Sequence, residues 1–146
     1  MTGSKQIKYL DMELMEKMCH KIAVAIFDTT DDPIAFFHEH DTNKLDAALN
    51  LPRAGVVGQE LYPSLIDKAV ILYYALNKNH AFKNGNKRIA TTSLIVFLHI
   101  NGFLLSVDKG KFLQKTLSVA ESDRKDKDIV LADIKEFIKS NLAKTR

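Results

Sequence analysis

The sequence has few of the features that mark secreted or membrane proteins. It contains one cysteine, Cys19, among 146 residues, so no disulfide can form within the chain and a Cys/His metal cluster is excluded. No stretch approaches the roughly 18 consecutive apolar residues that span a bilayer. Residues 1–10 lack the apolar segment of an export signal. We therefore expect a cytoplasmic protein without a membrane segment.

Strong charge of either sign is also missing. Lys and Arg number 21 and Asp and Glu 18, which gives a net charge of +3. A balance this close to zero does not argue for a nucleic-acid partner, and we expect no direct nucleic-acid binding. The chain is 46% hydrophobic and 27% charged, which fits a single ordinary domain over residues 1–146.

Helical spacing of apolar residues accounts for most of the chain. Cys19 lies on the apolar stripe of the first such segment, where an inert buried thiol is expected. The run from Thr29 to Pro33 should end that helix, and residues 50–58 indicate an irregular or hairpin segment too short to form a sheet. The expected helices cover residues 11–27, 43–49, 63 to between 77 and 79, 86–101, 109–120 and 129–142.

A polar, glycine-containing loop interrupts the most apolar part of the sequence. Residues 80–88 lie between two segments that are apolar on most sides and should form central helices. Gly85 can adopt a left-handed backbone conformation, which lets the N–H groups of residues 84–88 converge at the start of the next helix. The helix dipole favours an anion at that point. The predicted phosphate site comprises Asn84, Gly85, Asn86, Lys87 and Arg88.

Charged and titratable side chains flank this loop. Arg88 can bind a phosphate through two N–H groups, and Lys87 adds a second positive charge, so the pair suits a di- or triphosphate. A lysine in a first helical turn can also simply be solvated. Imidazole readily accepts a proton near neutral pH. We therefore assign His80 as the general base and count Lys87 and Arg88 with it as catalytic.

The segment His80-Ala81-Phe82-Lys83-Asn84-Gly85-Asn86-Lys87-Arg88 resembles the signature of the Fic/Doc family, His-x-Phe-x-Asp/Asn/Glu-Gly/Ala-Asn-x-Arg. The resemblance extends from about Leu10 to Leu142. It implies an all-α fold, a compact helical bundle with a short β-hairpin-like flap before the motif. It also implies that the histidine deprotonates a hydroxyl of a target protein, which then attacks a nucleotide phosphate, and that Phe82 belongs to the core side of the loop.

The resemblance implies further sites on either side of the motif. Asn84 stands where many relatives carry an acidic magnesium ligand, although an asparagine here can also serve only as a helix N-cap. The target protein is expected to pair with the flap as an added strand. The segment in register with that flap is residues 51–58, with Arg53, Gly55 and Val57 as target contacts. Arg53 can also be only a surface charge.

Two positions favour the Doc branch of the family. Relatives that transfer a nucleoside monophosphate usually carry a glycine and a second arginine where this chain has Lys87 and Thr91. Doc-like toxins resemble kinases that transfer the terminal phosphate, and their known target class is elongation factor Tu. The resemblance thus implies ATP as substrate with Mg²⁺, and a Ser/Thr hydroxyl of a translation factor as acceptor.

The regulatory glutamate pattern of Fic proteins, Ser/Thr-x-x-x-Glu-Gly/Asn, does not occur in this sequence. The resemblance therefore implies a separate Phd-like antitoxin that covers the nucleotide or target groove with a helix. Two alternatives stay open: a protein adenylyltransferase of the Fic type, and a non-catalytic domain that keeps the fold only to bind a partner.

Overall fold

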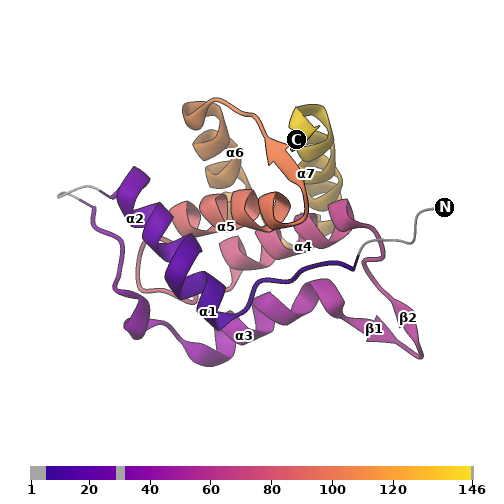
Figure 1. Cartoon of the computed structure of the whole chain (residues 1–146), viewed down its shortest axis with the longest axis horizontal. Helices are drawn as coiled ribbons and strands as arrows, with labels where there is room; N and C mark the ends of the chain where they lie inside the picture. The colour runs from indigo at the N-terminus through magenta and orange to yellow at the C-terminus, as the bar shows by residue number, and fades with distance from the viewer. Residues whose placement is uncertain (1–5, 29–31, 146) are drawn as a thin grey trace.

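Two antiparallel helices, α4 and α5, form the centre of the molecule in a computed structural model of the chain (Figure 1), which describes residues 6–28 and 32–145. The α-helices are α1 (Met12–Leu14), α2 (Lys21–Phe27), α3 (Thr42–Asn50), α4 (Leu65–Lys78), α5 (Asn86–Ile100), α6 (Lys109–Glu121) and α7 (Lys127–Asn141). The strands are β1 (Gly55–Val56), β2 (Gln59–Glu60), β3 (Phe103–Leu105) and β4 (Leu142–Lys144). Short 3₁₀ turns occupy Phe37–Glu39, Leu51–Arg53 and Arg124–Asp126.

The central pair is buried because other helices cover it on several sides. α6 and α7 pack against one side, the helix formed by residues 12–27 packs against α5, and α3 packs against α4 (Figure 1). Nearly every residue of α4 from Lys68 onward is buried, which agrees with the absence of a polar face in the sequence. The short loop between α4 and α5 is therefore held between two rigid elements.

The first helix agrees with its expected bounds of residues 11–27. The Asp11 carboxylate accepts a hydrogen bond from the Leu14 N–H and caps it, and α2 ends at Phe27. Its middle section, Met15–His20, is a π-helical turn. Cys19 is fully buried, and this burial raises the pKa of its thiol to about 11, so the thiol is inert, as expected. Residues 29–31 of the predicted terminating run lie outside the described residues.

Two short antiparallel hairpins complete the fold. β1 pairs with β2, so the segment that the sequence predicts to be irregular or a hairpin forms a hairpin. β3 pairs with β4, which the sequence does not predict. The expected last helix therefore stops at Asn141 instead of Leu142, because the backbone of residues 142–144 pairs with β3. Within residues 6–28 and 32–145 the structure is predominantly helical with these two hairpins, which matches the expected all-α fold.

None of the helices in the described part of the chain combines the length and the apolarity that crossing a membrane requires.

Candidate functional site

The motif loop turns into α5 through Gly85, which is the N-cap of that helix. Gly85 has a φ of +83°, and a Cβ atom built on it would lie 2.9 Å from the Cγ2 of Ile34. Only glycine fits both the conformation and the space. As the N-cap, Gly85 makes no side-chain capping hydrogen bond, and the start of a helix presents N–H groups that can bind an anion. Asn84, for which an N-cap role was one alternative, is not the cap.

A cavity of about 490 Å³ opens at this helix start. Its volume falls within the usual range for small-molecule sites. One side is the motif loop and the first turn of α5, and the other is an apolar strip from α6. Its lining comprises Asp32, Asn77, His80, Lys83, Asn84, Gly85, Asn86, Lys87, Arg88, Leu113, Leu117 and Ala120. The structure thus brings His80 and all five predicted phosphate-site residues to one cavity.

His80 reaches this cavity because α4 ends two residues before it, at Lys78. His80 is exposed and has a φ of +50°. A non-glycine residue at positive φ is uncommon and costs free energy. The backbone thus leaves the helix direction at the residue assigned as general base.

Asn86 holds the loop closed. Its Oδ1 accepts a hydrogen bond from the Phe82 N–H at 3.0 Å, and its Nδ2 donates to the Phe82 carbonyl at 2.7 Å. Phe82 is buried, and its ring packs against those of His20, Phe37 and His40. The Asn86 side chain therefore shapes the phosphate site by fixing the loop backbone, in addition to any contact it makes with a ligand.

The two cations of the motif differ in their surroundings. Lys87 is exposed. The Arg88 side chain is 13% exposed, and its Nη1 donates to the carbonyls of Phe27 at 3.1 Å and Asp32 at 2.6 Å. Its Nη2 lies 3.2 Å from the Asp32 carboxylate. A bound phosphate would therefore share the Arg88 guanidinium with Asp32.

Two buried amide oxygens beside the cavity have no hydrogen-bond partner among the described residues. They are the Oδ1 atoms of Asn77 and Asn84. Buried polar atoms are rarely left unpaired, so each calls for an explanation. The sequence signal for Asn77 is a polar residue at the end of an apolar helix, a pattern that does not by itself indicate a functional residue.

The unpaired Asn84 oxygen is of the type that binds a hard cation such as Mg²⁺. Mg²⁺ commonly binds through one or two protein oxygens together with substrate phosphates. No group of three or more His, Cys, Asp or Glu side chains that could hold a metal occurs within residues 6–28 and 32–145. The residues present therefore fit a magnesium ion that binds together with a nucleotide.

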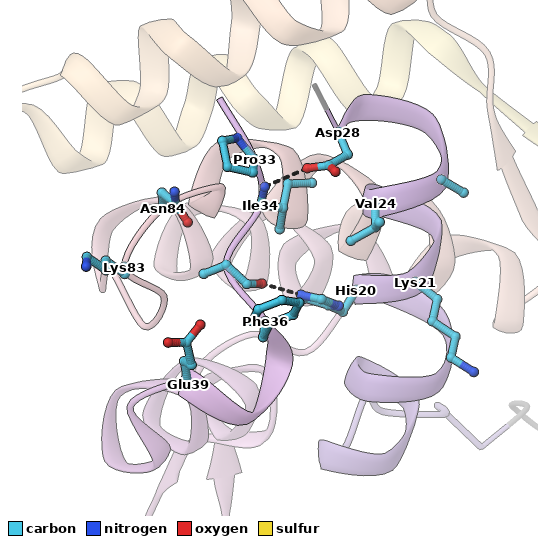
Figure 2. A pocket seen from close by; sticks show the side chains of 12 residues that line it. His20, Lys21, Val24, Asp28, Pro33, Ile34, Phe36, Glu39, Lys83 and Asn84 are labelled. Atoms are coloured by element: carbon cyan, nitrogen blue, oxygen red, sulfur yellow. Dashed lines mark hydrogen bonds between the residues drawn. The ribbon is translucent and has the colours of Figure 1, made fainter. Parts of the chain in front are cut away.

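A second cavity, of about 860 Å³, lies on the other side of the motif loop (Figure 2). Lys83 and Asn84 line both cavities. The extended segment that precedes Phe37 forms one wall and α2 forms the other. His20 holds this segment through a 2.7 Å hydrogen bond to the Ala35 carbonyl, and Asp28 accepts from the Ile34 N–H at 2.6 Å (Figure 2).

The structure does not bring the predicted flap residues to the motif. Arg53, Gly55 and Val57 lie in or beside the β1–β2 hairpin, which joins the N-terminal end of α4, whereas His80 follows its C-terminal end (Figure 1). A helix of the 14 residues that α4 contains is roughly 20 Å long. The hairpin residues and the motif therefore lie at opposite ends of α4, and the role of Arg53, Gly55 and Val57 as target contacts stays a prediction.

The hairpin has an anchor of its own. The Lys68 ammonium donates to the Pro52 carbonyl at 3.0 Å and to the Glu60 carboxylate at 2.6 Å, and so holds both ends of the hairpin against the first turn of α4. The Arg53 guanidinium lies 4.3 Å from the centre of the Tyr9 ring, and Val57 at the tip is 96% exposed. The segment that lies against the motif is instead residues 32–36, through Ile34 at Gly85.

Comparison with known proteins supports the motif assignment. The model of the family described as Fic/DOC matches residues 5–98. The chain is 48% identical over 68 residues to Toxin Doc of Mycolicibacterium smegmatis, a match that covers 47% of this chain and 52% of that relative. The chain thus spans about half the length of this curated relative. No solved structure matches the chain significantly. Because the family model matches well over half of the sequence and includes the whole motif, the chain belongs to the Fic/Doc family.

Proposed function

We propose that this protein is a Doc-like toxin of a toxin–antitoxin pair that transfers the γ-phosphate of ATP to a Ser or Thr hydroxyl of a translation factor such as elongation factor Tu. The observation that carries the proposal is a single cavity lined by His80, the uncapped start of α5, and the cations Lys87 and Arg88. The similarity to Toxin Doc supports the same function.

The proposed reaction uses His80 as the general base. Its imidazole takes the proton from the target hydroxyl, and the hydroxyl oxygen forms a bond to the γ-phosphorus. The bond between that phosphorus and the β–γ bridging oxygen breaks, and ADP leaves with the electron pair. The first-turn N–H groups of α5 and the Lys87 and Arg88 side chains stabilise the charge on the phosphate oxygens. When bound with ATP, Mg²⁺ would neutralise phosphate charge, with Asn84 as its protein ligand.

The position of Thr91 supports terminal phosphate transfer over nucleoside monophosphate transfer. Thr91 replaces the second arginine of adenylylating relatives and is 1% exposed. Its hydroxyl bonds to the Lys87 carbonyl at 2.9 Å and to the Thr116 hydroxyl at 2.8 Å. No cation stands at this position to bind a second phosphate. Lys87, in place of a glycine, adds bulk and charge at a different point of the site.

Kinase and adenylyltransferase activity are distinguished by which phosphorus of ATP, α or γ, appears on the target. Purified protein is incubated with elongation factor Tu and ATP labelled at either the α or the γ phosphorus. We expect the γ label on elongation factor Tu, at a Ser or Thr identified by mass spectrometry. The appearance of the α label would instead establish the adenylyltransferase alternative and reject the kinase.

His80→Ala separates catalysis from partner binding. We expect this variant to fold, to lose label transfer by about a hundredfold or more and to lose toxicity on expression. His80 is exposed, so its removal leaves the core intact. Unchanged toxicity and partner binding in the folded variant would instead favour the non-catalytic alternative.

The target strand is better accommodated along the extended residues 33–36 than on the β1–β2 hairpin. This segment borders the second cavity, lies against Gly85, and exposes the Phe36 side chain. A target segment that lies along it would present its hydroxyl close to the motif. The proposed antitoxin would block the reaction by placing a helix over the nucleotide or target groove. Co-expression with the adjacent gene should then abolish both toxicity and label transfer.

A further inference from the structure

Asn77 is a buried polar residue in the last turn of α4 that the proposed reaction does not use. It is 1% exposed, yet it lines the 490 Å³ cavity together with His80. Its Nδ2 donates to the Tyr73 carbonyl at 3.0 Å. Its Oδ1 has no hydrogen-bond partner in the described part of the chain.

The hydrogen bond to the Tyr73 carbonyl fixes the orientation of the Asn77 side-chain amide. The Tyr73 carbonyl is only an acceptor, so it must face the Nδ2 group of Asn77, and the Oδ1 must face elsewhere. An amide oxygen that has lost water without gaining a donor costs free energy. A ligand that supplies a hydrogen-bond donor at this point removes the cost.

The surroundings of Asn77 indicate which part of a ligand lies there. The phosphate cradle and both motif cations belong to the loop and the start of α5, whereas Leu113, Leu117 and Ala120 of α6 give the cavity an apolar strip. Such a strip suits the uncharged part of a nucleotide and not its phosphates. The cavity therefore has one subsite for an anion and one apolar subsite, and Asn77 is among the residues that line it.

We propose that Asn77 determines nucleotide specificity, its Oδ1 accepting a hydrogen bond from a donor on the nucleoside, either an exocyclic amine of the base or a ribose hydroxyl. This inference rests on the proposed function only in so far as the cavity binds a nucleotide. It does not depend on which phosphate is transferred or on which protein receives it.

The test compares ATP with inorganic triphosphate, which has the phosphates but no nucleoside. In the variant Asn77→Leu, calorimetry should show ATP binding weakened about tenfold, the usual cost of one lost hydrogen bond to a buried group. Triphosphate affinity should stay unchanged. Asn77→Ala repeats the measurement should the leucine variant fail to fold. The matched control is Asn79→Leu, because Asn79 bonds to the Lys44 carbonyl at 3.3 Å and does not line the cavity.

Two further nucleotides identify the donor. Inosine triphosphate lacks the exocyclic amine, and dideoxy-ATP lacks the ribose hydroxyls. The analogue that lacks the true donor should bind the wild type about tenfold more weakly than ATP does, and Asn77→Leu should add no further loss.

Asn77→Leu variants that bind ATP as tightly as the wild type would overturn the inference, and so would an equal loss of triphosphate binding. A wild type that binds neither ligand overturns both this inference and the proposed function. Wild-type protein that binds ATP but labels no protein rejects only the kinase proposal, and the difference between ATP and triphosphate in Asn77→Leu would still support the role of Asn77.

Discussion

The side chain of Asn86 and the main chain of Phe82 are joined by two hydrogen bonds, of 3.0 Å to the amide and 2.7 Å to the carbonyl. The five residues from Phe82 to Asn86 are thereby closed into a ring that places Gly85 at the start of α5. The motif asparagine is therefore a structural element of the phosphate site as well as a candidate ligand.

Asn86→Ala should weaken both the fold and the reaction. Loss of two hydrogen bonds should lower the free energy of unfolding by about 1–3 kcal/mol, measured by urea denaturation. Label transfer should fall further than stability alone explains, because the N–H groups no longer converge. Asn86→Asp retains the acceptor for the Phe82 N–H but not the donor, and should be intermediate. Equal stability of Asn86→Ala and the wild type would contradict this role.

Asp32 and a nucleotide phosphate should compete for Arg88. The Asp32 carboxylate lies 3.2 Å from the guanidinium and is 71% exposed. Asp32→Asn removes a negative charge next to the phosphate site, so ATP should bind about two- to fivefold more tightly, as expected for one exposed ion pair. Calorimetry at low salt measures this change, and high salt should reduce it. Weaker ATP binding in Asp32→Asn would instead show that Asp32 orients Arg88 for the phosphate.

Thr91→Arg should not convert the protein into an adenylyltransferase. The Thr91 side chain is buried and belongs to a hydroxyl network with Thr116, whose hydroxyl also bonds to that of Tyr73. An uncompensated charge there should cost about 3–5 kcal/mol of stability. Thr91→Val keeps the shape and loses only hydrogen bonds, at about 0.5–1.5 kcal/mol each. Thermal denaturation compares the two variants, and a stable Thr91→Arg protein that transfers the α label would refute the argument.

The pair of Asp67 and Lys135 should make stability depend on pH. The ammonium lies 2.9 Å from the carboxylate, and its hydrogen bond lowers the pKa of Asp67 below its ordinary value of 3.8. A lowered folded-state pKa stabilises the protein above the unfolded-state value, and the contribution is lost as the pH falls through the folded-state value.

Asp67→Asn should therefore be less stable than the wild type at neutral pH, by about 0.5–1 kcal/mol for a partly exposed pair. The difference should shrink as the pH drops below 3.8. Urea denaturation across this range measures it, and Lys135→Met should show the same loss. A difference that persists unchanged in acid would mean that Asp67 stabilises the protein through packing or capping and not through its charge.

Much of the fold follows from local sequence. The apolar spacing of residues 11–27 and the capping carboxylate of Asp11 are both local signals, and the helix forms where they indicate. The β3–β4 pairing is different, because Phe103 and Lys144 are 41 positions apart and meet only when α6 and α7 have folded back. Short exposed strands of this kind have no strong periodicity of their own.

At the candidate site, some features follow from the sequence and others from tertiary structure. Residues 51–58 have the turn-forming sequence of a hairpin, and they form one. The hairpin directly precedes α4 and His80 follows the end of that helix, so the order of the chain already separates them by the length of α4. The closeness of Ile34 to Gly85, 2.9 Å from a Cβ built there, depends instead on contacts between distant segments.

The order of residues in the motif determined, without any structure, that a histidine, a glycine turn and two cations stand next to one another at a helix start. Only tertiary structure decided what each group faces. Arg88 meets Asp32 across 56 positions of sequence, Thr91 meets Thr116 from another helix, and Asn77 has a buried oxygen without a partner among the described residues. Adjacent residues determine which chemical groups the motif loop carries. The partners of those groups and the burial of their side chains arise only when α4, α5 and α6 pack together.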